Sequence, residues 1–268
     1  MTAKQPLARE VRTLITGLAM GESPRWHEQR LWFSDWGAQE IIAVDVDGKT
    51  EVAVRVPFAL PFSIEWLPDG RLLIVSGREG LLMRRDPDGS LVPHADLRSL
   101  SDKVWNEIVV DGRGNAYING GAGVALLAPD GSVRQVADNF AWPNGMAITP
   151  DNSTLIIAES HGKKLTAFDI AVDGSLSNRR VWADLGSGVP DGICIDAHGA
   201  LSGTPTFPTS AACASAKAVT CCRPSSPSAA ASLACSEDRI EGRSSSLPRS
   251  GVVWRKPAKL RWSELGCY

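Results

Sequence analysis

Short polar turns built on Asp and Gly recur along most of this 268-residue chain, and they constrain its fold more than any other feature. Each turn borders short runs of alternating or β-branched apolar residues, such as RLLIVSG and STLIIAES. The turns lie at residues 45–48, 68–70, 87–89, 111–114, 129–131, 150–152 and 172–174. They recur about every 20 residues, so two hairpins make a unit of about 40 to 45 residues.

A unit of four short strands is typical of one blade of a β-propeller, and we therefore predict an all-β fold of this type. No stretch of comparable length shows a sustained helical period. A β-sandwich also uses short strands, but it does not need this regular spacing of two hairpins. About four such units precede Leu201, which is fewer than a closed ring of six blades requires.

The charge balance and the apolar segments exclude two classes of partner. The chain has 28 Lys and Arg against 30 Asp and Glu, with no basic stripe, so we expect no nucleic-acid binding. The amino terminus lacks the continuous apolar core of a signal peptide, and no segment is long and apolar enough to span a bilayer. We therefore expect a cytoplasmic protein without a membrane partner.

Four polar residues occupy equivalent places in the repeat and form a candidate site. Glu22, Asn106, Asn144 and Asp191 each precede a short apolar stretch that is followed by an Asp-containing turn. Propellers bring inner strand ends together at a central channel, where two carboxylates and two amide oxygens suit a hard cation such as calcium or magnesium. Alternatively, Asn or Asp before Gly serves only as a turn former. That alternative does not account for Glu22 or for the shared place.

Three segments carry a resemblance to a known family. GESPRW, WPNGMAITPDNSTLIIAES and VPDGICIDAHG resemble signature segments of the gluconolactonase family that includes senescence marker protein 30, also called regucalcin. The resemblance covers residues from about 9 to 201. It implies a six-bladed β-propeller that hydrolyses a sugar lactone with one divalent metal ion. Calcium is the first expectation, and zinc, magnesium and manganese remain open.

The resemblance also implies roles for individual residues. Glu22, Asn144 and Asp191 match the metal ligands of the family, and Asp191 would also act as the catalytic general base for the attacking water. Asn106 matches a substrate-contacting residue close to the metal, and the neighbouring Glu107 is assigned to the same substrate-binding segment. The small-molecule partner that these roles imply is a sugar lactone.

Two departures from the family pattern affect the substrate side of the site. Val104 stands where the family usually has Arg, two residues before Asn106, and only Gly120 to Gly123 stand where many relatives have a longer loop. The identity of the lactone is therefore open. Two alternatives to a lactonase also stay open: a non-catalytic propeller that binds calcium or another small ligand, and an inactive truncated product.

The composition changes abruptly after Leu201, and we divide the chain there into a partial propeller, residues 1–201, and a tail, residues 202–268. The tail consists largely of Ser, Thr, Ala, Pro and Cys, and it has hardly any strand pattern, which is typical of a low-complexity, disordered segment. It holds Cys213, Cys221, Cys222, Cys235 and Cys267 of the six cysteines, without His at ligand spacing. We therefore predict neither a disulfide framework nor a zinc site there.

A shifted reading frame offers an explanation for the tail. Codon degeneracy at Ser202 to Ser210 permits Trp-Tyr-Ala-Asp-Val-Pro-Asp-Lys in the shifted frame, which is a good propeller strand and turn. A later stretch permits Pro-Asp-x-x-Thr-Leu-Phe-Ile-Val-Ala, which is close to the protein's own Pro150 to Ala158. We interpret the tail as a frameshift product. This interpretation requires a Ser202 codon that ends in T and GGT at Gly203, and the nucleotide sequence of the gene tests both.

Overall fold

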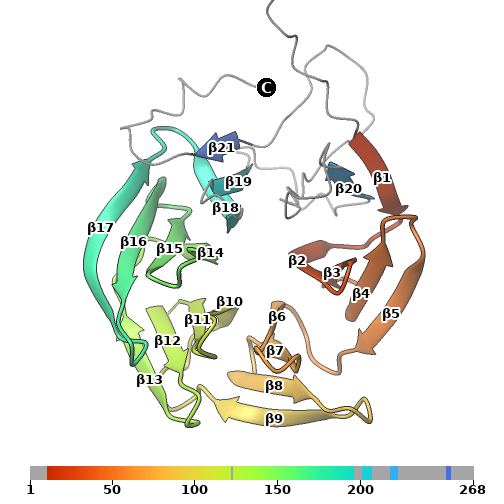
Figure 1. The fold of residues 1–268 in the computed structure, drawn as a ribbon, viewed down its shortest axis with the longest axis horizontal. Helices are drawn as coiled ribbons and strands as arrows, with labels where there is room; N and C mark the ends of the chain where they lie inside the picture. Colours follow the sequence, from red (N-terminus) through yellow and green to blue (C-terminus); the bar gives the residue numbers. More distant parts are fainter. Residues whose placement is uncertain (1–10, 122, 196–200, 207–217, 223–251, 255–268) are drawn as a thin grey trace, which may run out of the picture.

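The computed structural model describes residues 11–121, 123–195, 201–206, 218–222 and 252–254, and they form an all-β structure. Four antiparallel sheets of four strands stand around a central axis, as Figure 1 shows, so the predicted propeller with about four blades is confirmed. A three-stranded sheet and a two-stranded sheet lie between the last and the first of these blades. No helix in the described part of the chain has the length and apolarity needed to cross a membrane.

Each blade is a meander whose first strand lies nearest the axis (Figure 1). The inner strands are β2 (Gly21–His27), β6 (Phe62–Trp66), β10 (Trp105–Val110), β14 (Pro143–Ile148) and β18 (Val189–Ile195). The second strands are β3 (Arg30–Asp35), β7 (Leu72–Ser76), β11 (Ala116–Gly120), β15 (Thr154–Glu159) and β19 (Leu201–Thr206). The third strands are β4 (Glu40–Asp45), β8 (Leu81–Arg85), β12 (Gly123–Leu127) and β16 (Lys164–Ile170). The outer strands are β5 (Thr50–Arg55), β9 (Leu91–Asp96), β13 (Val133–Ala137) and β17 (Leu176–Asp184).

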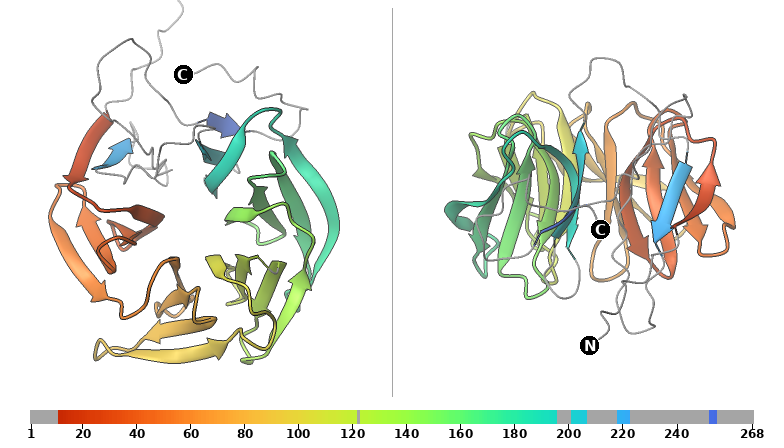
Figure 2. Two further views of the ribbon diagram at one scale, coloured as in Figure 1. Left: turned by 180° about the vertical axis from the view of Figure 1, so that it is seen from behind. Right: turned by 90° about the horizontal axis from the view of Figure 1, so that it is seen from above.

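We number the blades in chain order. Blades 1 to 4 are β2–β5, β6–β9, β10–β13 and β14–β17, and partial blade 5 consists of β18, β19 and β21 (Val252–Trp254). The two-stranded sheet pairs β1 (Val11–Thr16) with β20 (Ala218–Cys222), and it lies beside blade 1 in Figure 1. In the side view of Figure 2, the strands run from one face of the ring to the other.

The predicted turns join strands within the blades. Gly48, Gly70, Gly89, Gly114, Gly131 and Gly174 all have φ between 79° and 87°. In each turn the glycine N–H donates to the carbonyl three residues earlier, as from Gly70 to Leu67 at 2.9 Å. Asn152 takes the same left-handed position at φ 56° in the one predicted turn that lacks a glycine. Gly was therefore informative because this conformation is accessible mainly to Gly and Asn, and Asp because its carboxylate accepts a backbone N–H within the turn, as Asp69 does from Arg71.

The hydrophobic core consists of separate layers between neighbouring sheets. One layer joins blades 1 and 2 through Ile41, Phe62 and Ile74, and corresponding layers join blades 2 and 3, blades 3 and 4, and blade 4 and partial blade 5. The middle strands are covered on both faces, so β7 and β12 are buried along their whole length. This explains why their sequences, LLIVS and GVALL, are continuous apolar runs rather than alternating ones.

Short parts of the tail form strands, which its composition did not indicate. Residues 201–206 pair with β18, 252–254 pair with 201–206, and 218–222 pair with β1. Strand pairing uses backbone N–H and C=O groups, so it does not require an alternating side-chain pattern. The remaining tail residues lie outside the described part of the chain. The domain boundary at Leu201 and the frameshift interpretation therefore stay predictions.

Candidate functional site

Four of the five inner strands break register with their neighbours at the same point, near their first residues. The breaks lie between Glu22 and Arg25, Trp105 and Ile108, Pro143 and Met146, and Pro190 and Ile193. By contrast, β6 pairs with β7 without a break, and it carries no predicted site residue. Such β-bulges redirect side chains and are common beside active sites. We call the end of the ring at which the inner strands begin the site face.

The predicted site residues lie at these bulges. Asn106, Asn144 and Asp191 each follow directly after the last paired residue of their strand, and Glu22 is itself the last paired residue before its bulge. Asn106, Asn144 and Asp191 therefore share one bulge position, whereas Glu22 lies one residue earlier, at the position that corresponds to Trp105, Pro143 and Pro190. Four strands from blades 1, 3, 4 and 5 present these residues at the site face, around the centre seen in Figure 1.

At the site face, side-chain hydrogen bonds connect neighbouring blades. The Ile64 N–H donates to Ser23 Oγ at 3.1 Å, and Ser63 Oγ donates to the Asn106 carbonyl at 2.6 Å. Further along the ring, Asn119 Nδ2 donates to the Asn144 carbonyl at 2.5 Å, and Ser160 Oγ donates to the Pro190 carbonyl at 2.7 Å. These four bonds fix the bulge of each strand against its neighbour.

Sequence reasoning did not identify the residues that make these bonds. Ser23, Ser63, Asn119 and Ser160 are all at least nine-tenths buried, which is unusual for polar side chains unless they are hydrogen-bonded. Asn119 and Ser160 follow apolar runs in AYING and TLIIAES, and a polar residue at the end of such a run was the available signal. The partners of all four are backbone groups of other blades, an N–H for Ser23 and carbonyls for the other three, and no local pattern reveals them.

Asn144 and Asp191 lie on strands that approach one another very closely. A Cβ atom on Gly145 would lie 2.5 Å from the Asp191 carbonyl oxygen and 2.5 Å from the Ile193 nitrogen. Only a glycine next to Asn144 leaves room for the backbone next to Asp191. Ser160 strengthens this contact, because Asn144 Nδ2 donates to its Oγ at 3.3 Å while the same Oγ donates to Pro190.

Glu159 supports the segment that leads into Asn144. Its carboxylate accepts hydrogen bonds from the Ala141 N–H at 2.8 Å and from Thr166 Oγ1 at 2.5 Å. Burial acts to raise the pKa of Glu159, but these hydrogen bonds and the nearby charges of Lys164 and Arg179 hold that pKa below its ordinary value. Glu159 therefore stays ionised while it is 1 % exposed.

Glu107, which we predicted to contact substrate, is hydrogen-bonded to other groups of the protein. Its Oε1 accepts hydrogen bonds from Arg25 Nη2 at 2.9 Å and from the backbone N–H of Ile108 at 2.9 Å.

A second carboxylate, that of Glu65, lies beside Arg25, with Oε2 at 2.8 Å from Arg25 Nε. Burial raises the pKa of Glu65, against the opposing effect of Arg25. Burial alone would lower the pKa of Arg25, but the charges of Glu107 and Glu65 outweigh it and raise that pKa.

The donor atoms at the bulges fit a hard divalent cation. Glu22 and Asp191 supply carboxylates and Asn144 supplies an amide oxygen, which are the ligand types of calcium and magnesium. In the described part of the chain, no group of three or more His, Cys, Asp or Glu residues is arranged to hold a metal ion. A set of two carboxylates and one amide oxygen is not a group of this kind, because one of its three donors comes from Asn.

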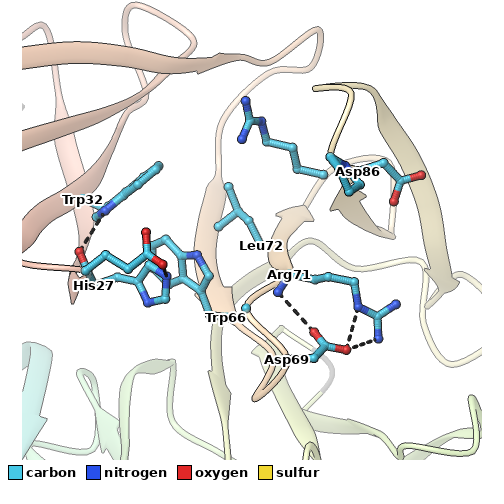
Figure 3. A pocket seen from close by; sticks show the side chains of 11 residues that line it. His27, Trp32, Trp66, Asp69, Arg71, Leu72 and Asp86 are labelled. Atoms are coloured by element: carbon cyan, nitrogen blue, oxygen red, sulfur yellow. Dashed lines mark hydrogen bonds and ion pairs between the residues drawn. The ribbon is translucent and has the colours of Figure 1, made fainter.

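Two cavities lie outside this set of residues. The first, of about 300 Å³, is lined by His27 and Trp66, the last residues of β2 and β6, so it opens at the face opposite the site face. Figure 3 shows these two rings face to face, with centroids 4.1 Å apart and Trp32 edge-on. The second, of about 380 Å³, includes Gly120 and Pro143 and lies at the site face between blades 3 and 4.

Known proteins share both the sequence and the fold of this chain. Regucalcin from Xenopus laevis is 28 % identical over 207 residues, which cover 68 % of this chain and 67 % of that protein. A gluconolactonase from Xanthomonas campestris has a solved structure that is 26 % identical, with a TM-score of 0.62 over 72 % of each chain. The calcium-binding protein regucalcin from Agrobacterium tumefaciens is 23 % identical, with a TM-score of 0.60 over 73 % of this chain and 70 % of that one, and this likeness shows the fold.

A family model agrees with these relatives. Its match covers residues 20–204, which include all four blades and the predicted site residues. The chain therefore belongs to the SMP-30/Gluconolactonase/LRE-like region family.

Proposed function

We propose that this protein hydrolyses a sugar lactone with the help of one divalent cation. The observation that carries the proposal is that Asn106, Asn144 and Asp191 are the first bulge residues of their inner strands, and that Glu22 directly precedes the bulge of a fourth inner strand. Membership of a family with a gluconolactonase relative supports the choice of substrate class.

Glu22, Asn144 and Asp191 would hold the cation, and the oxygen-only donor set favours calcium over softer metals, with magnesium, manganese and zinc as alternatives. A divalent cation, when bound, supplies Lewis-acid polarisation to an ester carbonyl and to water. The calcium-binding relative from Agrobacterium tumefaciens supports this choice of ion.

The chain's own residues would orient the substrate and move the proton. Asp191 accepts a proton from the attacking water at a carboxylate oxygen, which requires hydrogen-bond reach between them. Asn106 binds a substrate oxygen through its side-chain amide, because its backbone carbonyl is already engaged by Ser63. Glu107 contributes to this segment mainly through Arg25, to which it is bonded.

The test compares lactone hydrolysis and calcium binding in matched variants. Asp191→Asn keeps a ligand oxygen but removes the base, so we expect kcat to fall by about 10² to 10⁴-fold. Glu22→Gln should weaken calcium binding measured by calorimetry. Glu28→Gln is the control, because Glu28 is 80 % exposed and lies at the opposite face.

The outcomes separate the alternatives. Calcium binding without lactone hydrolysis in the parent protein would favour a non-catalytic binding propeller. The absence of both activities together with the lack of a cooperative thermal transition would favour an inactive truncated product. Hydrolysis that survives intact in Asp191→Asn would refute the assigned base.

A further inference from the structure

Arg25 connects three inner strands within the ring. It follows the bulge of β2, at the first position where β2 regains register with β3. Its Nε lies 2.8 Å from Glu65 Oε2 on β6, and its Nη2 lies 2.9 Å from Glu107 Oε1 on β10. Nη2 also donates to the Ile108 carbonyl at 2.8 Å. Because β2 belongs to blade 1 and β10 to blade 3, the guanidinium of Arg25 connects blade 1 to blade 3 and also contacts β6 of blade 2.

The contacts of Arg25 involve two of the four bulges at which predicted site residues lie. Nη1 donates to the carbonyl of Pro24, inside the β2 bulge, at 2.8 Å. Glu107 lies inside the β10 bulge, directly after Asn106, and it also accepts from Ser23 Oγ at 3.4 Å. One planar group therefore binds both bulges at once, and the forked donors of arginine permit this where a single ammonium would not.

The partly buried surroundings of Arg25 favour persistent ion pairs with Glu65 and Glu107. The side chains of Arg25, Glu65 and Glu107 are only 18 %, 20 % and 14 % exposed, so water and salt screen these ion pairs less than they screen surface pairs. The opposite charges keep Arg25 protonated at every accessible pH, since they raise its pKa despite burial.

We propose that Arg25 is a positioning residue that fixes the start of β2, which carries Glu22, relative to the start of β10, which carries Asn106. It acts through Pro24, Glu107 and Ile108 rather than by touching the cation or the substrate. The consequence for binding rests on the proposed function, whereas the mechanical connection between the two strands does not.

The first experiment replaces the guanidinium group of Arg25 with an ammonium group and so keeps the positive charge. In Arg25→Lys we expect binding of Ca²⁺ alone, measured by calorimetry, to weaken by about 10 to 100-fold, as for other residues that orient metal ligands. Hydrogen exchange of the Ile108 amide should accelerate, because this N–H donates to Glu107. Arg30→Lys is the matched control: Arg30 pairs with Glu51 at 2.7 Å inside blade 1, and both measurements should match the parent protein.

A second variant separates positioning from stability. Removing Arg25 alone would leave two shielded carboxylates unpaired and strongly destabilise the fold. The triple variant Arg25→Met, Glu65→Gln, Glu107→Gln removes all three charges, and we expect it to keep a cooperative thermal transition yet lose Ca²⁺ affinity to the same extent. Parent-like Ca²⁺ binding and exchange in Arg25→Lys, or parent-like Ca²⁺ binding in the folded triple variant, would overturn the proposal.

Failure of the proposed function is recognised separately. If the parent protein neither binds Ca²⁺ nor hydrolyses a lactone, the function fails, and amide exchange at Ile108 alone decides the role of Arg25. Faster exchange of the Ile108 amide in Arg25→Lys than in Arg30→Lys then supports the positioning role of Arg25. Equal exchange in the two variants refutes that role. The same comparison decides the matter if the triple variant does not fold.

Discussion

The contact between the Asn144 and Asp191 strands makes Gly145→Ala a sharp perturbation. The added Cβ would lie 2.5 Å from the Asp191 carbonyl oxygen and 2.5 Å from the Ile193 nitrogen, whereas ordinary contacts begin at 3.4 Å. The two strands must therefore separate by about 0.9 Å, the difference between 3.4 and 2.5 Å. Since both neighbours are backbone atoms, no side-chain rotation can relieve the overlap.

Two measurable effects follow from this separation. Overpacking of a rigid contact costs about 1 to 3 kcal/mol, so chemical denaturation should show a loss of that size in the free energy of unfolding. A displacement of about 1 Å between catalytic groups lowers the rate by about 10²-fold, so lactone hydrolysis should fall more steeply than stability. Calorimetric Ca²⁺ binding should weaken in parallel, because Asn144 and Asp191 are two of the three proposed ligands.

Gly121→Ala provides the matched control. Its Cβ would meet only Lys103 side-chain atoms, the nearest at 3.3 Å, and a flexible side chain can move by that amount. We expect stability and Ca²⁺ binding close to those of the parent protein. If Gly145→Ala unfolds at the parent's denaturant concentration and binds Ca²⁺ equally well, the close approach of β14 and β18 does not define this part of the site.

Three further predictions concern buried polar groups. Tyr117→Phe should cost about 1 kcal/mol in a denaturation experiment, because the buried hydroxyl donates to the Gly174 carbonyl at 3.0 Å. Ser34→Ala should leave stability unchanged or raise it slightly, since the buried Ser34 Oγ has no hydrogen-bond partner among the described residues and alanine removes that hydroxyl. The pKa of Glu159 is lower in the folded protein than its ordinary value. Its stabilising contribution is therefore complete above that ordinary value and is lost as pH falls through the folded pKa. Thermal unfolding between about pH 5 and 2 should show a smaller pH dependence in Glu159→Gln than in the parent protein, and an equal dependence would contradict this assignment.

The turns and blades were predictable because their causes are local. A glycine at φ near 83° after an Asp, as at Gly70, is determined by a few adjacent residues, and the same signal repeats in each blade. The shared place of Asn106, Asn144 and Asp191 was visible for a related reason. Each residue stands at a fixed distance before an apolar run, and the bulge of each strand lies at that same distance.

The connections between blades were not predictable, because they join residues distant in the sequence. Arg25 binds carboxylates 40 and 82 residues further along the chain, and neither Glu65 nor Glu107 stands in a motif that pairs it with an arginine. Glu107 was assigned to substrate from its place beside Asn106. Only the three-dimensional arrangement shows that a neighbouring side chain on the same strand can bind another blade.

The same connections indicate how an incomplete ring could hold a site. Each core layer and each of the four hydrogen bonds at the site face joins only neighbouring blades, so order extends from blade 1 to partial blade 5 step by step. Asn144 and Asp191 are neighbours in this series and are fixed by the direct contact at Gly145. Glu22 stands at the other end of the series, so small displacements accumulate between it and Asp191. Of the three proposed ligands, Glu22 therefore depends most on a connection such as Arg25, which bypasses one step by joining blade 1 directly to blade 3.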